Sequence, residues 1–171
     1  MKALGRIATR FPQTAYAGLV KALQNEWTYL QRVTTGSGSL YAPIEKAIIE
    51  NFLPALLGQA IIGKTMRDHT TLAVRRAGLG IPDPTTTTTA NHSASRDCSE
   101  LLVESLMTGE PINIVAHQKH ATDSQKSSKE QRKAQELRRL AQLKRGVFLV
   151  CHYVDGLTSH QAFHQEFAAI P

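Results

Sequence analysis

The sequence has few of the features that mark secreted, membrane or disulfide-stabilised proteins. Only two cysteines, Cys98 and Cys151, occur in 171 residues, and they form no Cys-x-x-Cys pair, so we expect reduced thiols. No apolar run reaches the roughly 18 residues of a membrane-spanning helix. Residues 1–6 lack the apolar segment of a signal peptide. We therefore expect an intracellular protein, cytoplasmic or nuclear, that is not secreted and has no membrane partner.

Motifs of the common catalytic and metal-binding classes are also missing. The sequence contains no Gly-x-Ser-x-Gly, no His-Glu-x-x-His and no plausible triad. His117 and His120, like His160 and His164, have spacings that place each pair on one helix face. Without paired cysteines, ordinary surface histidines explain them better than a zinc site. We predict no bound metal and no cofactor.

Helical periodicity is the clearest positive signal. Apolar residues recur with helical spacing between Tyr16 and Val33, around Trp27, and again from Ile44 to Leu53 after Pro43. This pattern predicts a helical hairpin with Trp27 in its seam, Leu30 on the buried side and Gln31 on the solvent side. Pro54 should kink or end the second helix, and Gly58 should mark its exit. A third helix is predicted over 93–107, with Leu102 and Leu106 inward, and a last long helix from residue 112.

The fold class that these patterns predict is mostly α, and the chain divides into four parts. We expect a frayed N-terminus (1–11), a helical domain (12–116), a long basic helical arm (117–145) and a short irregular or strand-like tail (146–171). Within the helical domain an extended break is predicted at 78–92, because two glycines and two prolines there cannot propagate a helix. Leu79 and Ile81 should pack onto the hairpin from this break. The threonine run 85–89 is expected to be a linker, and 158–170 a short helix.

Positive charge is concentrated in the arm. The chain has 20 Lys and Arg against 14 Asp and Glu, and residues 117–145 alone contain nine of the former and three of the latter. Because basic side chains that meet phosphates release counterions, we predict salt-dependent binding of RNA or DNA, with a merely solvated helix face as the alternative. The arm has no aromatic residue, so base stacking by the arm is not predicted. The candidate residues are Arg75, Arg76, Lys119, Lys126, Lys129, Arg132, Lys133, Arg138, Arg139, Lys144 and Arg145.

Two further functions correspond to particular patterns. Residues 58–65 match the phosphate loop G-x-x-x-x-G-K-[ST], in which Gly58, Gly63, Lys64 and Thr65 would contact a nucleotide. A true phosphate loop follows a buried parallel strand, whereas the preceding residues continue a helical period, which favours a chance match. The second alternative is a helical protein–protein interaction module. It would use the narrow apolar stripe of Ala134, Leu137, Leu140 and Ala141.

Several short blocks follow one another in an order that is informative. They are Phe11 to Leu19, Trp27 to Val33, Ala42 to Glu45, Phe52 to Gly58, Gly78 to Pro84 and Leu101 to His117. This ordered set, over roughly residues 8 to 120, resembles the region C-terminal to the polymerase core in retroelement-type reverse transcriptases. The resemblance implies a module that follows the palm, supports the thumb and its nucleic-acid-facing side, and has the rest of a reverse transcriptase as a partner.

One departure from that family limits what the resemblance implies. The Tyr/Phe-x-Asp-Asp element that binds the two catalytic metals of the family does not occur in this sequence. Residues 147–171 also differ from what would follow in the family. The resemblance therefore implies a non-catalytic fragment, not an enzyme, in which the match at Gly58 to Thr65 falls on a loop between helices.

Overall fold

The computed structural model describes the backbone of residues 1–155 and the side chains of residues 1–144. Every regular element in this part of the chain is helical, which confirms the mostly α fold class. In order, the elements are α1 (Lys2–Arg10), α2 (Pro12–Gly18), a π turn (Leu19–Leu23), α3 (Gln24–Val33), a 3-10 turn (Gly38–Tyr41), α4 (Ala42–Ala47), a π turn (Ile48–Phe52), α5 (Leu53–Leu57), α6 (Lys64–Thr71), a 3-10 turn (Val74–Arg76), α7 (Thr88–Thr108) and α8 (Ile114–Asp155).

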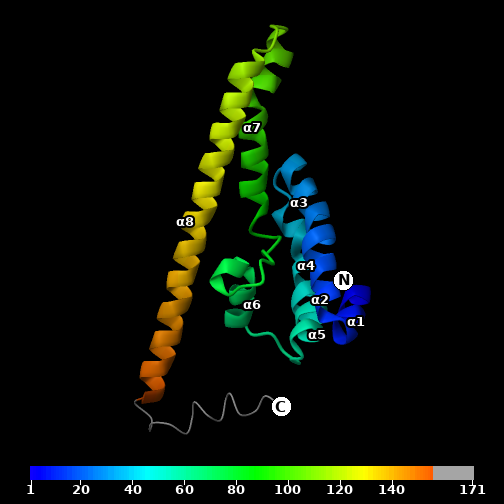
Figure 1. Ribbon diagram of the computed structural model, residues 1–171, viewed down its shortest axis with the longest axis vertical. Coiled ribbons are helices and arrows are strands. Elements are labelled where there is room, and N and C mark those ends of the chain that lie inside the picture. Colours follow the sequence, from blue (N-terminus) through cyan, green and yellow to red (C-terminus); the bar gives the residue numbers. More distant parts are fainter. Residues whose placement is uncertain (156–171) are drawn as a thin grey trace. The chain divides into compact units, whose positions relative to one another are not determined.

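The chain forms two units, Met1–Lys133 and Ala134–Pro171, and α8 passes from the first into the second. The first unit holds α1 to α7 and the start of α8, with α1 to α5 grouped together and α7 beside α8 (Figure 1). Its boundary lies within the basic segment rather than at residue 116. The reason is that α8 stays attached to α7 as far as Arg132, which hydrogen bonds to Asn91.

The N-terminal residues form an ordered helix, so the expectation of a frayed end is wrong. Helix α1 packs against α2 and α5, and its residues Gly5 and Ala8 are buried. The approach is close: a Cβ atom added to Gly5 would lie 2.9 Å from the backbone oxygen of Asn51. Such a contact depends on small residues rather than on large apolar ones, so it leaves no apolar stripe in the sequence to indicate it.

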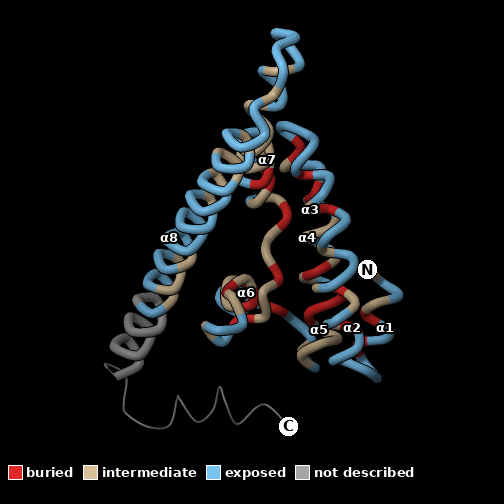
Figure 2. The backbone as a smooth tube through the Cα atoms, turned by 45° about the horizontal axis from the view of Figure 1, so that its top comes forward, coloured by how far each residue is buried: buried red, intermediate tan, exposed pale blue. Residues whose placement is uncertain are grey.

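The predicted hairpin is confirmed, but the buried face of its first helix shifts. Leu19, Trp27, Ile48 and Phe52 belong to one buried apolar cluster, and the buried residues of α2 to α5 are visible in Figure 2. In the π turn Leu19–Leu23, the N–H of Gln24 donates to the carbonyl of Leu19, five residues earlier. This extra residue in the turn changes which face of α3 points toward the core. Gln31 is therefore fully buried and Leu30 half exposed, the reverse of the sequence-based prediction.

Helix formation continues through Pro54, so of the two outcomes predicted there, a kink or an end, the end is wrong. The π turn Ile48–Phe52 ends two residues before the proline, and the N–H of Leu53 donates to the carbonyl of Ile48. This wider turn accommodates a residue that has no N–H and whose ring crowds the carbonyl of the preceding turn. The helix ends at Leu57, and Gly58 adopts the left-handed conformation with φ of 67°, as its predicted exit role requires.

The break before α7 ends at Thr87, five residues earlier than in the predicted 78–92. One carboxylate oxygen of Asp83 accepts hydrogen bonds from the backbone N–H of Thr85 at 2.8 Å and from its hydroxyl at 2.6 Å. This turn leads directly into α7, which begins at Thr88. The last two threonines of the run 85–89 are therefore helical, although the sequence predicts a linker over the whole run. Ile81 is fully buried and Leu79 packs against the same apolar cluster, as predicted.

Helices α7 and α8 form a second hairpin in the first unit. The hydroxyl of Ser105 donates to the carbonyl of Glu110 at 2.6 Å, and Gly109 ends α7 with a φ of 73°. Leu102 and Leu106, predicted to face inward, are exposed instead, because the contact between α7 and α3 does not extend to the end of α7. Most of α8 up to Lys144 is also exposed (Figure 2).

Helix α8 continues to Asp155, so the predicted strand-like stretch at 147–154 is wrong. A strand needs a neighbour to pair its backbone N–H and C=O groups, whereas a helix pairs them internally. Residues 1–155 offer no such neighbour, since they contain no strand. The short helix predicted at 158–170 lies outside the described residues. None of the helices within residues 1–155 combines the length with the apolar character that crossing a membrane requires.

We predict that Gly5→Ala lowers stability. Helix propensity alone would favour alanine inside α1 by roughly 1 kcal/mol, but the new methyl group meets the Asn51 carbonyl. We expect a net loss of about 1–2 kcal/mol in urea unfolding, as for an overpacked core. Gly63→Ala is the control, because a Cβ there meets nothing within 4 Å. A gain in stability from Gly5→Ala would mean that α1 is not docked.

Candidate functional site

The predicted nucleic-acid-binding residues lie on two elements. Arg75 and Arg76 belong to the 3-10 turn Val74–Arg76, and all the others belong to α8. Arg75 is exposed and Arg76 partly buried, and both already take part in interactions within the chain. In the second unit, Arg138 and Lys144 are exposed, Arg139 is partly buried, and Arg145 is described by its backbone only. The candidates therefore differ in how available they are to a ligand.

Four lysines of the first unit form one exposed stripe along α8, which we call the lysine stripe. Lys119, Lys126, Lys129 and Lys133 are spaced by seven, three and four residues, which places them on one helix face. All four are exposed, and at 1.5 Å per residue the stripe is about 21 Å long. Lys126 Nζ lies 3.8 Å from Oδ1 of Asp123. Because both side chains are largely in solvent, this ion pair is weak and holds Lys126 only loosely. The lysine stripe is thus free to meet a polyanion.

Arg132 is engaged differently from the lysines beside it. Its Nη2 donates to Oδ1 of Asn91 in α7 at 2.9 Å. The side-chain amide of Asn91 donates in turn to Oε1 of Gln31 in α3 at 2.6 Å, and Nε2 of Gln31 donates to the Pro84 carbonyl at 2.7 Å. We call this chain of hydrogen bonds the Gln31 relay. The relay holds α8 with Arg132 facing α7. The lysine stripe therefore faces away from α7, toward solvent.

The residues of the Gln31 relay were not predicted from the sequence. Apolar periodicity predicts Gln31 on the solvent face, because it does not reveal the π turn before it. The sequence predicts Asn91 in the extended break, whereas α7 already begins at Thr88. A buried amide that satisfies both its donor and its acceptor needs partners from distant segments. Spacing along one helix does not indicate such partners.

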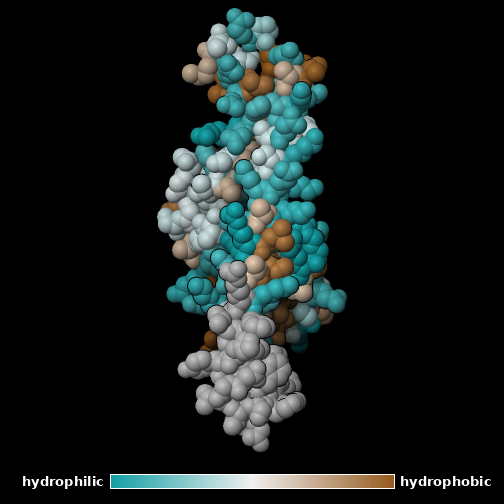
Figure 3. Space-filling view, turned by 90° about the vertical axis from the view of Figure 1, so that its left-hand side faces the viewer, coloured by the Kyte–Doolittle hydropathy of each residue, from teal (hydrophilic) through white to brown (hydrophobic). Residues whose placement is uncertain are grey.

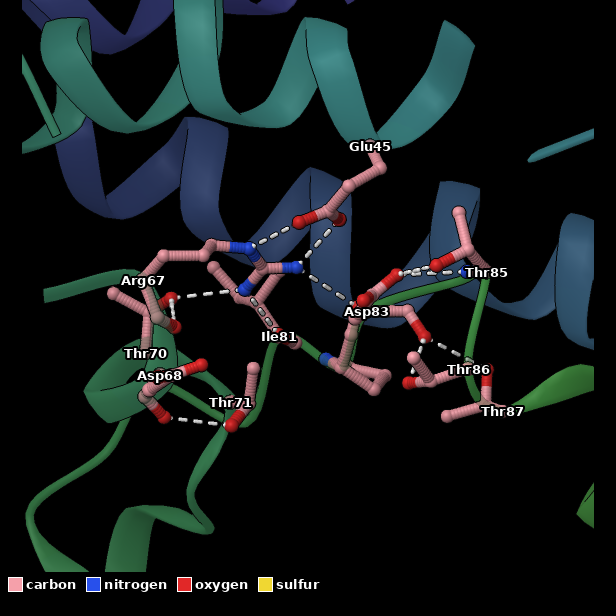
Figure 4. Close-up of polar contacts among 11 residues, drawn as sticks. Glu45, Arg67, Asp68, Thr70, Thr71, Ile81, Asp83, Thr85, Thr86 and Thr87 are labelled. Atoms are coloured by element: carbon pink, nitrogen blue, oxygen red, sulfur yellow. Dashed lines mark hydrogen bonds and ion pairs between the residues drawn. The ribbon is translucent and has the colours of Figure 1, made fainter. Parts of the chain in front are cut away.

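A dense polar cluster surrounds Arg67 of α6 (Figure 4). Its Nε and Nη2 donate to the two carboxylate oxygens of Glu45 in α4, each at 2.7 Å. Nη1 donates to the Thr70 hydroxyl at 2.9 Å and to the Ile81 carbonyl at 2.7 Å, and Nη2 also reaches the Pro82 carbonyl at 3.2 Å. A guanidinium has five N–H donors, so all of them are used. Arg67 is buried and has no donor left for a ligand, which makes its role structural.

The phosphate-loop match lies between two helices. Helix α5 precedes Gly58, and α6 begins at Lys64, directly after Gly63. Lys64 and Thr65 are exposed, while Ile62 in the same loop is buried in the apolar cluster. Since residues 1–155 contain no strand, the sheet that positions a phosphate loop is missing from this part of the chain. This geometry gives no support to nucleotide binding.

The histidines and cysteine near the second hairpin contribute to helix contacts. His120 Nε2 lies 3.5 Å from a carboxylate oxygen of Glu100, and the Cys98 thiol lies 3.8 Å from the Ala121 carbonyl, so both join α7 to α8. Among the side chains that the structure describes, no group of three or more His, Cys, Asp or Glu is placed to hold a metal ion. His160 and His164 lie outside those residues.

No protein-family model, curated protein or solved structure matches the chain. The fold and the charged surface define its class: a helical protein whose long helix α8 carries an exposed basic face.

We predict that Arg67→Met destabilises the protein by about 3–5 kcal/mol, because Glu45 keeps a poorly solvated charge without its partner. Lys46→Met is the matched control. It breaks an ion pair of 3.9 Å with Glu50 that is mostly in solvent and should cost less than about 1 kcal/mol. Urea unfolding followed by circular dichroism measures both. Similar small losses for the two variants would contradict the structural role of Arg67.

Proposed function

We propose that this chain is a non-catalytic helical module, related to the segment that follows the polymerase core of reverse transcriptases, and that it binds nucleic acid through the lysine stripe. One observation carries the proposal: Lys119, Lys126, Lys129 and Lys133 are exposed on one face of α8. The excess of basic residues over 117–145 supports it, because this segment holds nine of the 20 Lys and Arg of the chain.

Phosphate contacts account for the binding that we propose. Each lysine that meets a phosphate releases condensed counterions, so affinity should fall steeply with salt and depend little on sequence. The stripe offers ammonium groups along about 21 Å of helix and no aromatic ring. Base stacking and base-edge readout by this face are therefore not part of the proposal.

The other basic candidates contribute unequally in this proposal. Arg138, Arg139, Lys144 and Arg145 extend the basic character of α8 into the second unit. Arg132 is held by Asn91, and Arg75 and Arg76 have interactions within the chain, so each would have to leave or share a partner to reach a phosphate. We assign the main affinity to the lysine stripe.

Catalysis is not part of the proposed function. The Asp-Asp element that binds the metals of polymerase chemistry is missing from the 171 residues. If the module acts with a reverse transcriptase, the palm with its two carboxylates has to come from another part of that enzyme. The module would then contribute affinity for the nucleic acid rather than chemistry.

We predict that changing all four lysines of the stripe to glutamine weakens nucleic-acid binding and flattens its salt dependence. For a DNA duplex, losing four phosphate contacts should reduce the slope of log K against log salt by about 3–4. Filter binding at several salt concentrations measures the slope. Lys2, Arg6, Arg10 and Lys21, all exposed and outside α8, changed together to glutamine, provide a control with the same change in net charge.

The control variant should keep nearly the wild-type slope. Equal losses in the two quadruple variants would show that net charge, not the lysine stripe, determines binding. Binding by the wild-type chain that does not respond to salt would contradict the proposal altogether.

A further inference from the structure

The end of the hairpin formed by α7 and α8 carries exposed apolar side chains, which we call the hairpin tip. It consists of Val103, Leu106 and Met107 at the end of α7 and Ile114 and Val115 at the start of α8. All five are exposed, Leu106 and Met107 to 83% and 82%. Figure 3 shows hydrophobic side chains gathered at this upper end of the hairpin. Large exposed apolar patches rimmed by polar residues mark interaction sites.

The charge around the hairpin tip is the opposite of that of the whole chain. Residues 97–118 contain Asp97, Glu100, Glu104 and Glu110 and no Lys or Arg, although the chain has a net charge of +6. An acidic rim repels nucleic acid and anionic lipid surfaces. It favours a partner that offers apolar contact together with positive charge.

The chain itself contains such a surface. Between residues 134 and 144, Leu137 is exposed and Leu140 partly exposed, and Arg138 and Lys144 are exposed beside them. This stretch, which we call the basic apolar segment, complements the hairpin tip in both apolar character and charge. We infer that the hairpin tip of one copy docks on the basic apolar segment of a second copy of this chain.

The length of helix α8 favours docking between two copies. Ile114 of the hairpin tip and Lys133, just before the basic apolar segment, are 19 residues apart on the same helix. At 1.5 Å per residue, α8 itself separates them by about 28 Å. If two copies exchange tips reciprocally, the contact closes into a symmetric dimer, whereas a one-way contact would build open chains. This inference does not depend on nucleic-acid binding.

Sedimentation velocity of the nuclease-treated full chain, over about a hundredfold dilution range, tests for self-association. We expect a monomer–dimer equilibrium that Leu106→Gln with Met107→Gln weakens by about tenfold or more in Kd. The control is Leu40→Gln with Ile61→Gln, which removes two similarly exposed apolar side chains elsewhere and should leave the Kd unchanged. Circular dichroism checks that each variant is folded. A wild-type chain that stays monomeric throughout, or a tip variant that associates like the control, overturns the inference.

Charge reversal identifies the docking partner of the hairpin tip. Glu104→Lys and Arg138→Glu should each weaken self-association by about tenfold. A mixture of the two variants should associate again, since the native tip of one variant meets the native segment of the other and the reversed pair also matches. Failure of the mixture to associate while both variants are folded overturns the assignment of the basic apolar segment.

Discussion

The hydrogen bonds of Gln31 are the constraint on which the arrangement of the charged helices depends. Gln31 is fully buried; its amide donates to the Pro84 carbonyl, and its oxygen accepts from Asn91 of α7. Asn91 then accepts from Arg132 of α8. A buried polar group without a partner costs about 1–3 kcal/mol, so α3, α7 and α8 cannot turn against one another without breaking this relay. The outward direction of the lysine stripe follows from it.

The extended break explains why this fold needs buried polar side chains. Backbone carbonyls outside helices still require partners when they are buried. Those of Ile81 and Pro82 accept hydrogen bonds from Arg67, and that of Pro84 accepts one from Gln31. Two long side chains, one from α6 and one from α3, thus take the place of backbone pairing. They join α6 and α3 to the same segment, between the two hairpins.

Much of the fold could be predicted because its signals are local. Pro43 near a helix start, Gly58 at a helix exit and the buried Ile81 follow from residue type and periodicity. The buried face of α3 could not, because a π turn changes the phase without changing composition. For the candidate site, composition identified the basic residues of α8, but it could not distinguish Lys129 from Arg132, since that difference depends on where Asn91 lies in space. The likeness to reverse transcriptases stays a prediction.

Helix α8 has two sides, one held to α7 by Arg132 and one on which the lysine stripe is exposed. The most direct test compares two single variants, Lys129→Gln and Arg132→Gln, which remove one positive charge each from positions three residues apart. The measurement is the salt dependence of binding to a nucleic-acid duplex. We expect Lys129→Gln to reduce the slope by about 1 and Arg132→Gln to leave it nearly unchanged. Equal reductions in the two variants would contradict the orientation of α8 on which the account rests.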